Sequence, residues 1–280
     1  MTRTTWTEKK IAKMQADGAG DGAGTKYVPW IQVKDFSSRG RSRRLWSSKT
    51  ERTHHLLSDV EYQLFVALEW QRNVIDIREQ YPLDRALTQD IARSLGIAHP
   101  HYPGTQIPTV MTVDFLATVK NGSDITLVAY NAKAADEAED ERSLSKLEIQ
   151  REYFEQLRIE HHVVFDCDIP RQNVANIGDI REAPLRPDEL ELRPGYYSDL
   201  CERMLNDIPA RPNTLTLAAY CSEFDARFGC SPGVGIRVAR ILMFERTLIP
   251  DLSSPDLNRE PLAKFVMAAQ PALRHAAGGR

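Results

Sequence analysis

The fold of this chain is decided by the stretch Val110-Met-Thr-Val-Asp-Phe-Leu-Ala-Thr-Val119, a Lys-Asn-Gly-Ser turn, and Ile125-Thr-Leu-Val-Ala-Tyr-Asn-Ala-Lys133. Both runs are rich in the β-branched and aromatic residues that favour strands. Asn121 and Gly122 accept the positive φ angles that a two-residue hairpin turn requires. The stretch therefore predicts two antiparallel strands joined by a tight hairpin.

The hairpin carries few polar residues, and three of them lie where they would form a binding site for a metal ion. Asp114 interrupts an apolar run, where an unpaired buried carboxylate would be costly. Asn131 and Lys133 lie two residues apart and therefore point to the same face of the second strand. A carboxylate, an amide carbonyl and a lysine on one face predict a Mg²⁺ site in which the lysine positions water. The alternative is structural, with Asp114 capping a bulge and Lys133 standing at the sheet edge.

A helix is predicted ahead of the sheet, and its first turn holds another candidate ligand. Ser58 and Glu61 fit the Ser-x-x-Glu capping box, in which the two side chains bind backbone N–H groups. Glu61 would complete the metal-ligand set if this end of the helix faces the hairpin. The capping role explains Glu61 equally well without a metal, and Asp59 is an alternative ligand.

Composition indicates an ordinary globular protein. The chain has 280 residues, 42% hydrophobic and 27% charged, which favours two domains with a sizeable core. No apolar run approaches the roughly 18 residues of a membrane span, and the N-terminus lacks a signal-peptide core, so we expect a cytoplasmic protein without a membrane partner. The four scattered cysteines indicate reduced thiols, and the histidines lack zinc-binding spacing and are expected in loops and at helix ends.

The charge distribution matters more than the formal net charge of −3. Basic residues cluster after residue 34, where the Ser/Arg stretch from Ser37 to Lys49 is expected to form a loop or arm, and the late helix carries Arg237, Arg240 and Arg246. Each group would bind DNA phosphates if it lies beside the site, and each also fits a solvated surface. The predicted phosphate-binding residues are Arg39, Arg41, Arg43, Arg44 and Lys49.

The order of the predicted elements indicates two domains after a flexible lead-in of residues 1–25. Residues 26–168 read as helix, strand, helix, hairpin, helix and strand, which is an α/β unit with a mixed sheet. Residues 169–194 carry the Pro, Asn and Asp signals of a linker. The rest of 169–280 is mainly helical, with two helices, a Gly-containing turn and a β-like segment at 248–252 that resemble a winged helix.

Five motifs follow one another along the chain: Ser58-Asp-Val-Glu61, Asp76-Ile-Arg-Glu-Gln-Tyr-Pro-Leu83, Gly96-Ile-Ala-His-Pro100, Val110-Met-Thr-Val-Asp-Phe-Leu116 and Asn131-Ala-Lys133. In this order they resemble the TnsA family, the endonuclease subunits of heteromeric TnsA/TnsB transposases. The resemblance covers the chain from about Tyr27 to Asn258, and its specific part is the combination of the second and fourth motifs.

The resemblance implies a restriction-endonuclease-like nuclease domain followed by a winged-helix domain. Glu61 and Asp114 would bind Mg²⁺, with two ions expected, and Lys133 would be the catalytic lysine. Asn131 stands where the family has Gln. Gln150 stands where a family carboxylate is expected, so Glu148 would substitute as a ligand. Both departures bear on metal number and activity.

The function implied is metal-dependent cleavage of transposon 5′ ends, on the non-transferred strand, during cut-and-paste transposition. A TnsB-type transposase would make the 3′ cuts and joins, and the C-terminal domain would contact DNA and a TnsC-type AAA+ regulator. Two other hypotheses stay open. One is a DNA- and protein-binding adaptor with a decayed nuclease core, and the other is a stand-alone restriction or repair nuclease.

Overall fold

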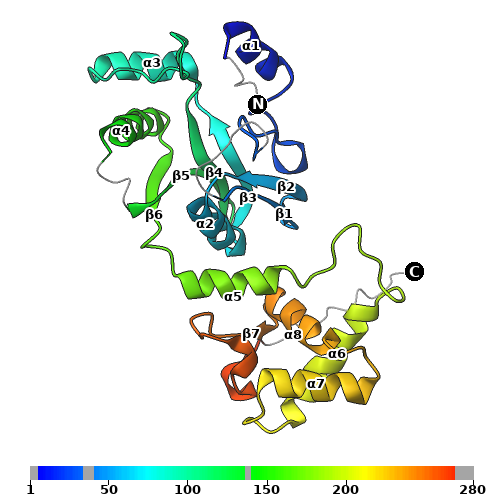
Figure 1. Ribbon diagram of the computed structural model, residues 1–280. Helices are drawn as coiled ribbons and strands as arrows, with labels where there is room; N and C mark the ends of the chain where they lie inside the picture. Colours follow the sequence, from blue (N-terminus) through cyan, green and yellow to red (C-terminus); the bar gives the residue numbers. More distant parts are fainter. Residues whose placement is uncertain (1–5, 34–40, 136–139, 269–280) are drawn as a thin grey trace. The chain divides into compact units, whose positions relative to one another are not determined.

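A computed structural model describes residues 6–33, 41–135 and 140–268 (Figure 1). The chain divides into two compact units, Met1–Ile169 and Pro170–Arg280. The first contains a mixed sheet with helices around it, and the second is mainly helical. The predicted α/β architecture with a mixed sheet is therefore confirmed. None of the helices in the described ranges is long and apolar enough to cross a membrane.

The first unit alternates helices and strands. In chain order they are α1 (Glu8–Ala16), η1 (Gly24–Lys26), β1 (Arg43–Ser47), β2 (Arg52–Leu56), α2 (Asp59–Trp70), β3 (Val74–Pro82), α3 (Arg85–Ser94), β4 (Thr112–Asn121), β5 (Asp124–Lys133), α4 (Glu141–Gln156) and β6 (Glu160–Phe165).

The main sheet has the strand order β3-β4-β5-β6, and the predicted hairpin forms its centre. β4 and β5 pair antiparallel from Phe115↔Tyr130 to Asn121↔Asp124, and Gly122 in the turn has φ +62°. β3 adds antiparallel to β4. β6 pairs parallel to β5, because α4 returns the chain to the same end of the sheet.

Helices cover both faces of this sheet (Figure 1). The ring of Phe115 lies 6.1 Å from the ring of Phe65 in α2. Leu116, the next residue, packs in a buried cluster with Ile91 of α3 and Ile149 of α4. Since neighbouring residues of a strand point to opposite faces, α2 covers one face while α3 and α4 cover the other.

The predicted flexible lead-in is wrong for α1. Ile11 is buried in a cluster with Trp30 and Tyr102, and the ring of Trp6 stacks on Tyr102 with 4.0 Å between centroids. A helix this short is stabilised by tertiary packing more than by its own propensity, so its local sequence gives little sign of it. Trp30 belongs to the same cluster, and residues 30–33 form no strand.

The basic stretch, expected to be a loop, forms the hairpin of β1 and β2 instead. Residues 34–40, which include Arg39, lie outside the described part of the chain. Burial alternates along β2, and its buried side carries Arg52, His54 and Leu56. Burial of these polar groups against β3 depends on a partner that is distant in sequence.

That partner is Glu79 of β3, which is fully buried. Arg52 donates from Nη1 to Oε1 over 2.9 Å and from Nη2 to Oε2 over 2.5 Å. His54 Nδ1 donates to Oε2 over 2.8 Å, while its Nε2 accepts from the Thr50 hydroxyl over 2.7 Å. Burial by itself would raise the pKa of Glu79, but His54 and Arg52 lower it to about 2. The carboxylate therefore stays charged and joins the small hairpin to the main sheet.

The second unit contains α5 (Arg171–Arg181), α6 (Tyr196–Asp207), η4 (Ile208–Ala210), α7 (Leu217–Phe228), α8 (Val234–Phe244), β7 (Leu248–Ile249), η5 (Leu257–Arg259), η6 (Leu262–Lys264) and β8 (Val266–Met267). The predicted linker is thus wrong for α5, where Val174, Ile177 and Ile180 are buried along one side. Helical spacing of these residues is present in the sequence.

Three features of the second unit correspond to the expected helix-turn-helix region. Gly229 ends α7 with φ +65°, and α8 follows after a short turn. β7 pairs antiparallel to β8. The assignment of this region as a winged helix stays a prediction.

The Glu79 network makes a stability prediction. Glu79→Ala leaves Arg52 buried without its anion, and we expect the first unit to lose about 3–5 kcal/mol. Removing the exposed Asp90–Arg93 pair by Asp90→Ala is the control and should cost about 0–1 kcal/mol. All four tryptophans lie in the first unit, so urea titration followed by tryptophan fluorescence reports on it. A loss below about 1 kcal/mol for Glu79→Ala would contradict the prediction.

Candidate active site

The predicted site residues Asp114 and Asn131 meet where β4 and β5 separate. Both strands continue beyond their last pair, Phe115↔Tyr130, but they no longer pair with each other there. The Asp114 carboxylate takes over part of the ladder, because its Oδ2 accepts from the backbone N–H of Ala132 over 2.8 Å. Asn131 Nδ2 lies 3.5 Å from the same oxygen. The Asp114 carboxylate therefore accepts a hydrogen bond that a backbone carbonyl would accept in a regular ladder, and it lies at the end of the sheet where the strands separate.

Glu61 performs its capping role and also lies beside Asp114. Ser58 Oγ accepts from the Glu61 N–H over 3.1 Å, and Glu61 Oε2 accepts from the N–H of Leu57 over 2.8 Å. Burial and then the charge of Asp114 raise the pKa of Glu61, which places the two carboxylates within electrostatic reach. The alternative ligand, Asp59, is instead paired with Arg43 at 2.6 Å. The capping and site interpretations of Glu61 are therefore compatible.

Lys133 is the positive group of the site. Burial raises the pKa of Asp114, and the charge of Lys133 is the largest effect that opposes this rise. Lys133 is partly exposed at the end of β5, in the position that its two-residue spacing from Asn131 predicts. The four predicted catalytic residues thus gather at one end of the sheet, from α2, β4 and β5.

Gln80 joins this group and was not predicted. Its Nε2 lies 3.5 Å from Asp114 Oδ1, its Oε1 accepts from the Thr112 hydroxyl over 3.1 Å, and a hydrogen bond from it lowers the pKa of Glu61. Gln80 has φ +47°, a left-handed conformation that costs free energy in a residue with a side chain. No local sequence pattern predicts this positive φ angle.

His161 is the second residue that sequence reasoning missed. Its Nε2 lies 2.7 Å from Asn131 Oδ1, and its ring packs 5.0 Å from that of Phe154 in α4. Burial and then the neighbouring His162 lower the pKa of His161 to about 4. The parallel register Ala129↔His161 places His161 on the side of Asn131, and this register could not be read before the strand pairing was known.

Glu148 lies apart from the carboxylate pair. It forms an ion pair with Arg151 at 2.8 Å, while Gln150 turns toward the sheet and donates to the Thr112 carbonyl over 2.7 Å. Within residues 6–33, 41–135 and 140–268, no group of three or more His, Cys, Asp or Glu is placed to hold a metal ion. The role predicted for Glu148 stays a prediction.

The predicted phosphate-binding residues divide into two kinds. Arg43 pairs with Asp59 and lies 4.2 Å over the ring of Tyr62, and Lys49 donates to the Val74 carbonyl over 2.5 Å. These two serve the packing of β1 and the following turn. Arg41 and Arg44 are exposed. Arg41 and Arg44 therefore present exposed positive charge, which would bind the phosphates of a DNA backbone.

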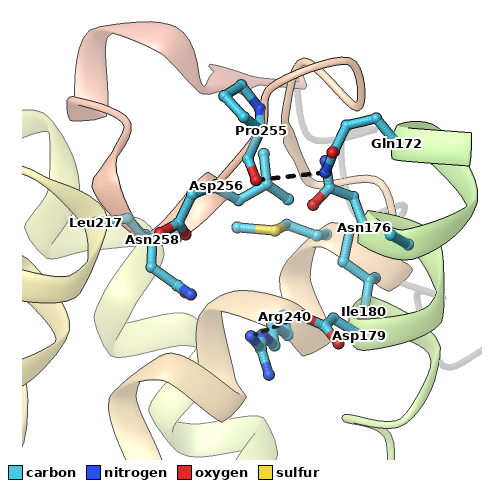
Figure 2. Close-up of a pocket in the computed structure, with 12 residues that line it drawn as sticks. Gln172, Asn176, Asp179, Ile180, Leu217, Arg240, Pro255, Asp256 and Asn258 are labelled. Carbon is cyan, nitrogen blue, oxygen red and sulfur yellow. Dashed lines mark hydrogen bonds and ion pairs between the residues drawn. The ribbon is translucent and has the colours of Figure 1, made fainter.

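The second unit contains a separate pocket of about 200 Å³ between α5, α8 and residues 255–258 (Figure 2). Its polar lining is engaged within the unit. Arg240 pairs with Asp179 at 3.3 Å, and Asn176 Nδ2 donates to the carbonyls of Leu252 and Ser254 over 2.8 and 2.7 Å. Figure 2 also shows Gln172 reaching the Pro255 carbonyl. None of the predicted site residues lines this pocket, whose polar groups hold the C-terminal loop.

Comparison with known proteins relates the part of the first unit that carries Asp114 and Lys133 to an endonuclease family. Residues 71–166 match the family described as TnsA-like endonuclease N terminal. This segment carries Asp114, Asn131 and Lys133, whereas Glu61 precedes it. The predicted resemblance to this family is confirmed for residues 71–166.

One known protein is similar to a longer part of this chain. The chain is similar to the Transposon Tn7 transposition protein TnsA of Escherichia coli, with 42% identity over 166 residues. The aligned part covers 59% of this chain and 60% of that protein. The chain therefore spans less than two thirds of the length of this relative.

The raised pKa of Glu61 predicts how the stability of the first unit depends on pH. Burial and the charge of Asp114 raise the pKa of Glu61 from 4.5 to about 8. The folded chain therefore holds this proton more tightly than the unfolded chain, and stability falls as pH rises through this range. With divalent cations chelated, we expect the wild-type first unit to lose stability between about pH 5 and about pH 8, and Glu61→Gln to lose markedly less.

Urea titrations at several pH values, followed by tryptophan fluorescence, measure this difference. Asp124→Asn is the control, because Asp124 is an exposed carboxylate in the same hairpin and should follow the wild type. Equal pH slopes for wild type and Glu61→Gln would show that Glu61 does not share the field of Asp114.

Proposed function

We propose that this protein is the DNA endonuclease subunit of a transposase and hydrolyses a phosphodiester at the 5′ ends of a transposon, on the non-transferred strand. The observation that carries the proposal is the meeting of Glu61 with Asp114 and Lys133, both of which belong to the endonuclease-family segment. The Tn7 relative, a transposition protein by name, supports the setting. The mixed sheet supports a restriction-endonuclease-like assignment, and α7, α8 and the β7–β8 ladder support a winged-helix assignment.

The residues fit a divalent metal ion. Burial and the charge of Asp114 raise the pKa of Glu61, burial raises that of Asp114 against the charge of Lys133, and every candidate ligand is an oxygen atom, as Mg²⁺ prefers. Glu61 and Asp114 would hold the ion, with the Asn131 amide oxygen as a third ligand. Such an ion supplies charge neutralisation at the phosphoryl oxygens and lowers the pKa of a bound water. This set suits one ion, and a second would need ligands from the DNA.

Lys133 has the position to direct the attacking water. Its ammonium group lies in the field of Asp114, so it is held at the carboxylate end of the site. A fixed positive charge there orients the lone pairs of a water molecule and stabilises negative charge that develops on the phosphate. Gln80 would keep the two carboxylates in place by binding both.

The proposed partners follow from the relative and from surface charge. Transposon-end DNA would contact the exposed side chains of Arg44 in the basic hairpin and of Arg41 just before it. A TnsB-type transposase would supply the 3′ cuts and the joining reaction, and a TnsC-type AAA+ regulator would contact the second unit. The protein would act on DNA in the cytoplasm.

The second candidate function is an adaptor that binds DNA and transposase subunits without cutting. The observation favouring it is the Asn131 amide, whose oxygen accepts from His161 while its nitrogen faces Asp114. In this orientation the amide offers no ligand atom to a metal ion. Cleavage assays separate the two functions.

The cleavage prediction concerns Asp114. In a reaction with the partner transposase, the regulator, transposon-end DNA and Mg²⁺, Asp114→Ala should lower 5′-strand cleavage by at least about 100-fold, since losing about 3 kcal/mol of charge stabilisation has that effect. Denaturing gels with each strand labelled at its end measure the cuts. Asp124→Ala, an exposed residue of the same hairpin, is the control and should cut normally.

The outcomes discriminate the hypotheses. Unchanged 5′ cleavage in Asp114→Ala and Lys133→Ala would favour the adaptor. Sequence-specific cutting by the purified protein alone would favour a stand-alone nuclease.

A further prediction concerns the basic hairpin. Changing Arg41 and Arg44 together to Ala should weaken binding to duplex DNA of any sequence and reduce the slope of log affinity against log salt by about 2, because each phosphate contact contributes about 1. Arg93→Ala, an exposed arginine of α3, is the control. An unchanged salt slope in the double variant would exclude this hairpin from the DNA interface.

A further inference from the structure

The amide of Asn131 is held between two different partners. Its Oδ1 is 2.7 Å from His161 Nε2, a short hydrogen bond, and its Nδ2 is 3.5 Å from Asp114 Oδ2, a long and weak one. Because Oδ1 can only accept, Nε2 of His161 carries a proton in this arrangement. The stronger contact of the amide is therefore made away from the carboxylate pair.

This orientation is the reverse of the one that a metal ligand needs. A cation bound by Asp114 would repel the amide nitrogen and attract the amide oxygen. The required change is a half-turn of the carboxamide about its last side-chain bond, which exchanges Nδ2 and Oδ1 without moving the backbone. After the half-turn, Nδ2 would face His161 and would need an acceptor there.

A neutral imidazole can satisfy both orientations. One of its ring nitrogens carries a proton and the other a lone pair, and the two tautomers differ only in which nitrogen has which. Nε2 donates to Oδ1 in the first orientation and accepts from Nδ2 in the second, when the proton lies on Nδ1. A side chain that is only a donor or only an acceptor allows one orientation alone.

The remaining contacts make the half-turn inexpensive. The ring of His161 is held against Phe154, so its position is the same for both tautomers. Asp114 Oδ2 keeps its 2.8 Å hydrogen bond from the Ala132 N–H when the amide turns away. Only the long contact between Nδ2 and Oδ2 is lost, and the cation replaces it.

We propose that His161 is a positioning residue that lets Asn131 present its amide nitrogen to Asp114 in the metal-free protein and its amide oxygen to a bound divalent cation, through a change of imidazole tautomer. The inference rests on the proposed metal-dependent function and deepens it. It also explains how Asn131, which is shorter than the Gln of the family, would serve as a metal ligand. The orientation of its amide is set by His161, which can donate or accept a hydrogen bond.

The direct test is ¹⁵N NMR of the whole protein labelled at histidine, with the His161 signals assigned by their loss in His161→Gln. We expect the Nε2–H tautomer in the metal-free protein and the Nδ1–H tautomer at saturating Mg²⁺. The Asp114→Ala protein should show no change on adding Mg²⁺. An unchanged His161 tautomer in wild-type protein that calorimetry shows to be saturated with Mg²⁺ overturns the inference but leaves the proposed function standing. Absence of Mg²⁺ binding overturns both.

Metal affinity provides an independent readout. By calorimetry, His161→Leu should bind Mg²⁺ about 10–100-fold more weakly, the usual effect of losing a group that orients a ligand. His161→Gln, which can donate and accept, should stay within about threefold of the wild type, a small fraction of that effect. His162→Leu is the matched control, because His162 is the next residue of β6 and is exposed. Wild-type affinity in His161→Leu would contradict the proposal.

Discussion

The buried carboxylate of Glu79 is the constraint on which the first unit depends. A charge removed from water must be balanced locally, and Arg52 and His54 of the small hairpin provide that balance. The hairpin is thereby held against β3 at one residue, and the OH of Tyr27 donates to the Glu79 carbonyl over 3.0 Å. The next residue, Gln80, takes a left-handed backbone angle that would be unfavourable in an isolated strand. The contacts on either side of it hold the chain in that conformation.

Glu79 and the pair Glu61–Asp114 show two opposite uses of a buried carboxylate. His54 and Arg52 outweigh burial and bring the pKa of Glu79 to about 2, whereas burial and the charge of Asp114 bring that of Glu61 to about 8. The charge of Glu79 is balanced within the protein and stabilises the fold. In the Glu61–Asp114 pair, Lys133 lowers the pKa of Asp114 but burial still raises it, and under the proposed function a bound cation would supply further positive charge. Neighbouring parts of one sheet therefore differ in charge balance.

Much of the candidate site was predictable because its signals are local. The two-residue spacing of Asn131 and Lys133 and the position of Asp114 in an apolar run indicated one sheet face, and the structure brings these residues together. Gln80 and His161 could not be predicted, since a neutral amide and one of several histidines carry no distinguishing pattern. Their roles arise from strand register and from contacts over tens of residues.

Elements whose signals lie within a few residues were readable from the sequence. The Asn121-Gly122 turn specified the hairpin, and the Ser58–Glu61 capping box specified the start of α2, because turn angles and first-turn hydrogen bonds depend on immediate neighbours. Three features became visible only in the folded chain: the helical state of α1, the basic hairpin, and the contact of His161 with the amide of Asn131. Each of these depends on burial or on a hydrogen bond to a residue far along the chain, and such free energies exist only once the sheet has assembled.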